Sequence, residues 1–250
     1  LDLTYYNNLT KNQIMQVPLA ASSGYTSQWM NAGEISNKGL EVVLNVVPVQ
    51  TANFQWEATF NWSKNNNKVE KLNDQLKTLQ IASSFVALHA TVGKPYGELM
   101  GYNYVFDSEG NKVVAANGVY AKTAQTEGLG SVLPDWLGGV RNSFRYKNFD
   151  AGFLIDVRKG GYFYSITQQY GMYSGTLEET AANGIRENGL VLEGVQGTVA
   201  YNADGSYTVT NTRPNDKNVS AFEWGRSHSS GVQAQNVFKS DYVKLREITA

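Results

Sequence analysis

The stretch FQWEATFNWS, residues 54–63, decides how this chain is read. Phe54, Trp56, Ala58, Phe60 and Trp62 alternate with polar residues without a break. A period of two places the apolar side chains on one face of a β-strand and the polar ones on the other. Eight steps of about 3.3 Å, at a tilt near 45°, give a height of roughly 19 Å. The strand therefore suits a membrane β-barrel, and it equally suits a soluble β-sandwich with its apolar face in a core.

The amino-acid composition argues against several classes of protein. The chain has 250 residues, of which 17% are charged, and a net charge of −1, so no nucleic-acid partner is indicated. It has no cysteine, which excludes a disulfide scaffold and a cysteine-based zinc site. No apolar run approaches 18 residues, so we expect no transmembrane helix. Alternating patterns reach both ends of the chain, and we expect it to be a piece of a longer protein.

Further alternating segments predict a set of paired strands. Residues 40–47 and the strand starting at Phe54 form a predicted hairpin around residues 48–53. Residues 136–146 and 149–158 form a second hairpin that turns at Lys147 and Asn148. Strands at residues 1–5 and 242–249 bring the total to six. Leu154 on a polar face and Asn142 on an apolar face are exceptions to the pattern.

Long segments without clear periodicity separate these strands: residues 7–38, 64–135 and 159–240. Residues 107–112 predict a tight turn, and Thr176 and Glu179 have the spacing of a helix capping box, with Gly184 ending a short helix. Structureless loops of this length argue against an ordinary compact domain. Short turns on one side and long loops on the other are typical of outer-membrane barrels. This asymmetry favours the barrel.

Four segments, in this order, resemble the late barrel region of the SusC/RagA-type TonB-dependent outer-membrane transporters. They are NAGEISNKGLEVVLNVVPVQTANFQWEATFNWSKNNNKV (31–69), VGKPYGELMGYNYVFD (92–107), LPDWLGGVRNSFRYKNFDAGFLIDVRKGG (133–161) and DYVKLREIT (241–249). Four motifs in the family's order over nearly the whole chain make the resemblance specific. The family places a turn and two barrel-closing strands after the last of these motifs.

The resemblance implies an all-β fold, an antiparallel transmembrane β-barrel segment of about six strands from a 22-stranded plugged barrel with long extracellular loops. Residues 1–250 would be part of the barrel domain, with the plug domain, the TonB-interacting segment and the final strands outside them. It implies import of oligosaccharides or oligopeptides across the Gram-negative outer membrane, with a SusD-like surface lipoprotein as lid and TonB as the source of energy. The partners would be that lipoprotein, TonB, outer-membrane lipid and the cargo. A soluble β-sandwich carbohydrate-binding module is the alternative.

The residues do not predict an enzyme. His89 and His228 lie far apart, which disfavours a metal site, and no nucleophile–base pair, metal ligand set or cofactor motif is recognisable. Charged residues of the polar strand faces should meet a plug or water: Glu41, Glu57, Arg141, Arg145, Asp156, Arg158, Lys244 and Arg246. Loop aromatics are the candidate contacts for cargo or lid, because aromatic faces stack on sugars and pack on peptides. They are Tyr102, Tyr104, Tyr162, Phe163, Tyr164, Tyr170 and Tyr173. Packing among the loops is the simpler reading for each of them.

Overall fold

A computed structural model describes residues 1–19, 21–31, 33–73 and 76–250. Its main feature is an antiparallel six-stranded sheet in the order β1-β4-β5-β11-β12-β19, which we call the wall sheet. The strands are β1 (Asp2–Thr10), β4 (Glu34–Gln50), β5 (Phe54–Lys71), β11 (Trp136–Tyr146), β12 (Phe149–Lys159) and β19 (Tyr242–Thr249). The six predicted strands are confirmed as antiparallel neighbours.

The apolar side chains of the wall sheet share one face, as their alternation predicts. Phe60 pairs with Val140, which pairs with Ile155. One end of this face carries the row Phe54, Tyr146 and Phe149, in which each residue lies opposite the next. Directly opposed residues point to the same side of a sheet. Phe54, Trp56, Phe60, Trp62, Phe149, Phe153 and Ile155 therefore lie on one face, which agrees with the alternation of apolar and polar residues in their strands.

The opposite face of the wall sheet is polar, and ion pairs cross it. Arg141 on β11 and Glu247 on β19 pair at 2.7 Å over Leu154, which lies between them on β12. Leu154 thus lies beneath an ion pair that joins the strands on either side of it, which explains its place on the polar face. Arg246 pairs with Asp156 at 2.8 Å. Among the described residues, Arg141, Arg145, Asp156 and Arg246 are the predicted polar-face residues that form ion pairs, and each pairs with another residue of the wall sheet.

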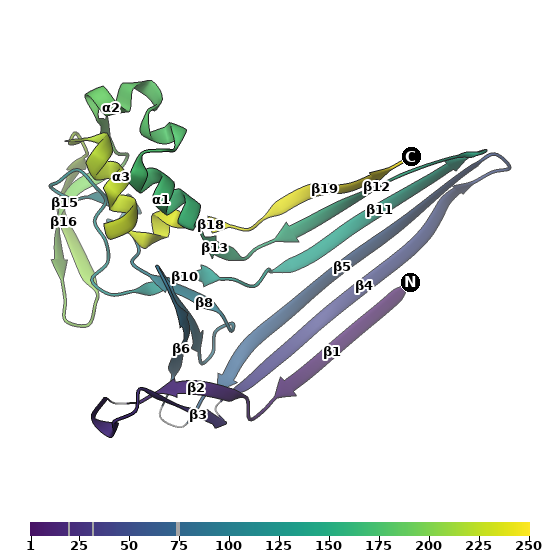
Figure 1. The fold of residues 1–250 in the computed structure, drawn as a ribbon, viewed down its shortest axis with the longest axis horizontal. Coiled ribbons are helices and arrows are strands. Elements are labelled where there is room, and N and C mark those ends of the chain that lie inside the picture. The colour runs from purple at the N-terminus through teal and green to yellow at the C-terminus, as the bar shows by residue number, and fades with distance from the viewer. Residues whose placement is uncertain (20, 32, 74–75) are drawn as a thin grey trace.

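Both tight turns lie at one end of the wall sheet and the long connections at the other (Figure 1). The first turn is shorter than predicted. Strand β4 continues past Pro48 to Gln50 through a bulge, and Thr51 closes the turn by a backbone bond to Phe54 at 2.8 Å. Proline has no backbone N–H to donate to the neighbouring strand, and it is accommodated here because pairing is already interrupted at a bulge. The second turn falls at Lys147 and Asn148, as predicted.

The long connections are folded, so the expectation of irregular segments at 7–38, 64–135 and 159–240 is wrong for the described residues. They hold four small sheets besides a hairpin: β10-β8-β7-β6, β16-β15-β9, β13-β18 and β14-β17, with β2-β3 as the hairpin. The first set comprises β2 (Ile14–Pro18), β3 (Ser27–Asn31), β6 (Thr78–Ser83), β7 (Ala87–Thr91), β8 (Glu98–Gly101), β9 (Val113–Val114) and β10 (Glu127–Ser131). The second comprises β13 (Tyr162–Tyr164), β14 (Leu190–Val191), β15 (Val195–Tyr201), β16 (Tyr207–Pro214), β17 (Asn218–Val219) and β18 (Val237–Lys239). Positions 20, 32 and 74–75 of those segments lie outside the described residues.

In the described part of the chain, three α-helices accompany these strands: α1 (Ile166–Ser174), α2 (Ile185–Asn188) and α3 (Ala221–Ser230). The predicted capping box at Thr176 and Glu179 is wrong. Thr176 instead bonds back to the Gly171 carbonyl oxygen, and the 3₁₀ turn Glu178–Thr180 has no side-chain cap. Gly184, with φ 69°, separates a second 3₁₀ turn from α2. Two serines cap the longer helices: Ser165 accepts a bond from the Gln168 amide at 3.1 Å and begins α1, and Ser220 accepts one from the Glu223 amide at 3.2 Å and begins α3.

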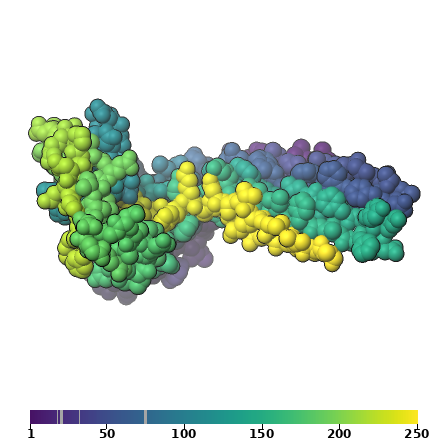
Figure 2. Space-filling view, turned by 90° about the horizontal axis from the view of Figure 1, so that it is seen from above, coloured from purple at the N-terminus to yellow at the C-terminus, as the bar shows by residue number. Residues whose placement is uncertain are grey.

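The buried apolar residues lie in the folded loops and where these meet the wall. Met15 and Val17 of the β2–β3 hairpin pack on Ile35 and Val69, near the loop ends of β4 and β5. Two further clusters form around Val105 and Val113 and around Val114, Leu192 and Val219. The space-filling view shows the result, a long narrow slab with the loop mass at one end (Figure 2). Among the described residues, no helix has the length and apolar character needed to cross a membrane.

Candidate functional site

The seven predicted loop aromatics lie in the folded loops, but they do not form a single site. Tyr164 and Tyr170 both contact Phe85, with ring centroids 6.2 and 5.6 Å away. Tyr102 is tied to the same place through its backbone, because its amide donates to the side chain of Gln233 at 2.8 Å. Gln233 in turn donates to the Phe85 carbonyl oxygen. The structure thus joins three of the predicted residues around Phe85.

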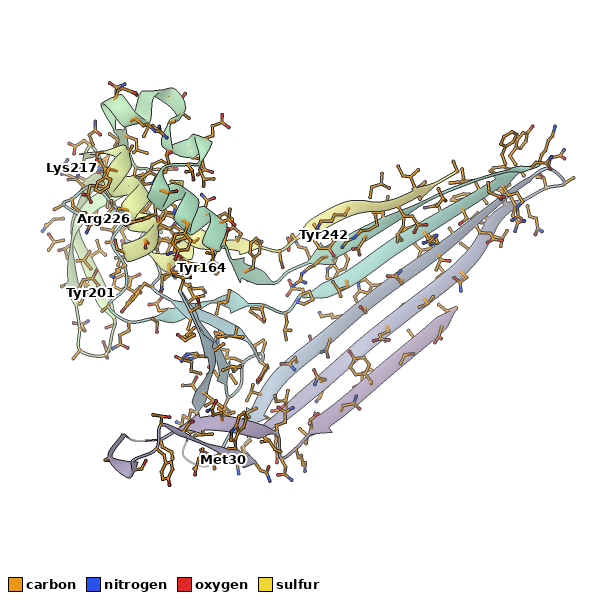
Figure 3. The ribbon with its side chains drawn as sticks, in the orientation of Figure 1. Met30, Tyr164, Tyr201, Lys217, Arg226 and Tyr242 are labelled. Atoms are coloured by element: carbon orange, nitrogen blue, oxygen red, sulfur yellow. The ribbon has the colours of Figure 1, made fainter. Side chains whose placement is uncertain are left out.

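Tyr164 belongs to a buried polar network beneath α1 and α3 (Figure 3). Its hydroxyl donates to the Gln169 side-chain oxygen at 2.6 Å and accepts a bond from the Asn236 amide at 3.1 Å. Asn236 also accepts a bond at 2.9 Å from Nδ1 of His228. Burial raises the pKa of Tyr164 and lowers that of His228. Both groups are therefore neutral at pH 7, and they position the two helices.

Tyr104 lies in a second aromatic group. Its ring meets that of Tyr120 edge-on at 5.1 Å and that of Phe106 at 6.1 Å. The ammonium group of Lys112 lies 4.1 Å from the Tyr104 ring centroid, within the range of a cation–π contact. Burial is the main cause that raises the pKa of the Tyr104 hydroxyl above its ordinary value. Tyr104 therefore acts chiefly in packing.

A polar hollow of about 720 Å³ adjoins this group. Its walls come from the turn at 107–112, from Glu193 to Val195 and from the end of β16. Arg213 in this wall pairs with Asp216 at 2.7 Å, and the Tyr120 hydroxyl donates to the Glu193 carbonyl oxygen at 3.1 Å. A hydrogen bond from the Asn111 side chain to the Asp107 carboxylate is the main cause that lowers the pKa of Asp107. Existing bonds thus occupy most of the polar groups that line the hollow.

The remaining predicted aromatics differ in exposure. Tyr162 lies against Gly130, where a Cβ atom would come within 2.4 Å of its ring. Phe163 is 47% exposed and pairs with Phe238, with ring centroids 6.0 Å apart. Tyr173 is 54% exposed at the end of α1. Phe163, Tyr170 and Tyr173 are the predicted aromatics that offer substantial free surface.

The sequence analysis did not single out Phe222, an exposed aromatic residue on the helices. Phe222 in the first turn of α3 is 68% exposed. With Tyr173 and Arg186 it lines a shallow depression of about 350 Å³ on the outer surface of the helices. Arg186 is held there by a bond to the Gly175 carbonyl oxygen at 2.6 Å. The spacing of Ser220 and Glu223 was the available signal, because a capping box there predicts the helix that carries Phe222.

The predicted histidines are not brought together. His89 lies on β7, whereas His228 lies on α3 in the buried network. Within the described ranges, no group of three or more histidine, cysteine, aspartate or glutamate side chains has the arrangement of a metal site. The geometry found in the loops is that of contact surfaces made of aromatic rings and neutral hydrogen-bonding groups.

Comparison with known proteins identifies the relatives of this chain. No family model matches it. TonB-dependent receptor P3 of Formosa agariphila is 30% identical over 185 residues, covering 64% of this chain and 18% of the receptor. TonB-dependent receptor SusC of Bacteroides thetaiotaomicron is 25% identical over 183 residues, 64% of this chain and 17% of SusC. The chain thus spans less than a fifth of the length of these relatives.

Solved structures agree on the fold. The RagAB peptide importer in its closed-closed state superposes with a TM-score of 0.66 at 16% identity, over 98% of this chain and 26% of that one. The RagAB importer in its open-open state gives a TM-score of 0.63 at 15% identity. The resemblance noted from the sequence motifs is therefore confirmed. The chain is similar in sequence to TonB-dependent receptors, SusC among them, and shares its fold with part of the RagAB importer.

Proposed function

We propose that residues 1–250 form part of the barrel domain of an outer-membrane TonB-dependent importer, as about six strands of a 22-stranded plugged barrel. The folded loops would lie on the extracellular side, where a SusD-like lipoprotein closes over an oligosaccharide or oligopeptide cargo. TonB would supply the energy through another part of the protein. The contribution of these residues would be wall and loops, without catalysis or a cofactor. The names and fold of the relatives support this proposal.

The apolar face of the wall sheet is the observation that carries the proposal. Phe149 is 78% exposed and Phe60 is 41% exposed on this face. An aromatic row of Phe54, Tyr146 and Phe149 borders it at the turn end, and Trp62 and Trp136 lie near the loop end. Aromatic bands at two heights on one face suit the two interfaces of a bilayer. The β-sandwich alternative would instead require these rings to be covered by a second sheet.

Cysteine labelling of the full-length protein in membranes tests this placement. Residues 1–250 contain no cysteine, so single substitutions report one position each once any cysteine elsewhere in the full-length protein has been replaced by serine. We expect Phe60→Cys and Phe153→Cys to react with a lipid-soluble maleimide and to resist a charged, water-soluble one. Glu57→Cys and Asp156→Cys, on the other face, should resist the lipid-soluble reagent. Equal labelling of all four by the water-soluble reagent, in a folded protein, would reject the barrel.

A further inference from the structure

A group of lysines lies on the same face of the wall sheet as the apolar side chains, just beyond them at the loop end. Strand β5 continues after Trp62 with Lys64, Asn66 and Lys68 in alternate positions on this face. Lys64 lies opposite Leu40 of β4, and Lys38 of β4 lies opposite both Asn66 and Asn7. Lys38 therefore sits diagonally between Lys64 and Lys68, about 7–8 Å away between Cα atoms. We call Lys38, Lys64 and Lys68 the lysine cluster.

The charge of the lysine cluster is only partly neutralised within the sheet, because Glu70 is the one carboxylate among the described residues that interacts with Lys68 and Lys38. Lys68 pairs with Glu70 at 2.7 Å, and the Ser36 hydroxyl also donates to Glu70 at 2.7 Å. Lys38 and Lys64 are exposed, and the described residues include no ion-pair partner for either one. The neighbouring Asn7 and Asn66 are exposed and add neutral hydrogen-bonding groups. The face thus presents two exposed ammonium groups without an ion pair, and one of them, Lys38, lies between the amides of Asn7 and Asn66.

The surroundings indicate what kind of ligand suits these charges. Immediately toward the turn end lie the apolar side chains Leu40, Val42 and Trp62 on the same face. An amphiphile with an anionic head and acyl chains would match both parts at once, since the ammonium groups would bind phosphate and the apolar side chains would contact the chains. The surface is that of an open sheet and not of a pocket, so free phosphate would be held weakly. Lysine is a point-charge binder of phosphate, and its attraction to anionic lipid surfaces is well established.

We propose that the lysine cluster binds the phosphate-bearing head group of an outer-leaflet membrane lipid. This inference rests on the proposed membrane placement of the apolar face. It adds a lipid-binding site on the outside of the wall, separate from the loop surfaces that would meet cargo and lid. Lys159 is not part of the cluster, because it lies opposite Trp136 on another strand pair, where it pairs with Asp241 at 2.6 Å.

The experiment measures lipid binding to the full-length transporter in detergent by native mass spectrometry, with purified bis-phosphorylated lipid A as the probe. We expect Lys38→Gln with Lys64→Gln to weaken binding about 25-fold, because each lysine near an anionic lipid surface contributes about a factor of five. Lys38→Arg with Lys64→Arg should retain binding, since the charge is kept. Lys147→Gln with Lys244→Gln removes the same charge elsewhere and should leave binding unchanged.

Unchanged lipid binding in the glutamine variant would overturn the inference. Displacement of lipid A by equimolar inorganic phosphate would also overturn it, because the site would then recognise the free ion. A glutamine variant that loses the lid lipoprotein while it keeps lipid would identify a protein contact instead. If the glutamine pair fails to insert, Lys64→Gln alone and the arginine pair still supply the comparison. Loss of the lipid-soluble labelling at Phe60→Cys would reject the membrane placement itself, a result that can be told apart from failure of the lysine cluster alone.

Discussion

The indole Nε1 of Trp56 on β5 donates a hydrogen bond at 2.9 Å to the side-chain oxygen of Asn142 on β11. Asn142 lies on the apolar face and is 8% exposed. The rings of Phe144 and Trp56 stack beside it, with centroids 6.0 Å apart. A polar side chain on a face proposed to meet lipid is thus used to satisfy a tryptophan donor. This explains why Asn142 breaks the alternation of β11.

We expect Asn142→Leu to destabilise the full-length protein by about 1 kcal/mol, because it leaves the half-buried indole donor without an acceptor. Unfolding in urea, followed by tryptophan fluorescence in detergent micelles, measures the change. Trp56→Phe combined with Asn142→Leu removes both partners and should recover most of the loss. A double variant as unstable as the sum of the single ones would contradict the role of the bond.

The Arg141–Glu247 ion pair should contribute little by comparison. Its side chains are 48% and 41% exposed, and exposed pairs contribute less than about 1 kcal/mol. We expect Glu247→Gln to lower the free energy of unfolding by less than that amount, with an effect that shrinks in 1 M salt as charges are screened. The effect of Leu154→Ser, which changes the apolar side chain between the two partners, is measured for comparison. An effect of Glu247→Gln that is large and independent of salt would contradict the surface assignment.

The packing of α1 on α3 should weaken in mild acid. Burial lowers the pKa of His228 below its ordinary value of 6.5, and in the folded state the neutral ring donates to Asn236. The unfolded state therefore binds a proton first as the pH falls below about 6.5, and stability is lost from there down to the folded pKa. Hydrogen exchange of α1 and α3 at pH 7.5 and 5.5 measures this. His228→Gln should show a smaller difference between the two pH values, and an unchanged difference would assign the effect to another group.

The exposed pair Tyr173 and Phe222 offers the sharpest test of a lid contact. We expect Tyr173→Ser with Phe222→Ser to weaken lipoprotein association by at least about tenfold, since exposed aromatics are frequent hot spots of binding. Affinity measured by co-purification of the lipoprotein with the full-length transporter tests this. Tyr201→Ser, on the β15–β16 hairpin, is a matched loop control. Deletion of the whole segment 175–195 would be less clear, because it also removes buried Leu192. Unaltered association would mean that this surface has another role.

The sequence by itself determined the wall sheet. Strict alternation from Phe54 to Trp62 and in its neighbours specified the strands and which face each side chain takes, because a one-residue slip would exchange the faces. It also located the turn at Lys147 and Asn148 and, through motif order, the family. These features depend on local periodicity, which a single sequence displays.

Only the tertiary structure decided the loops and the exceptions in the wall. The Trp56–Asn142 bond joins residues 86 positions apart, and Gln233 bonds to Phe85 across 148 positions. Strands as short as β13 and β18 carry no periodic signal, and they are stable because they pair with each other and pack under α1 and α3. Partners at such separations depend on how the whole chain closes, so no local pattern encodes them. The loop aromatics could be named from the sequence, but their burial or exposure could not.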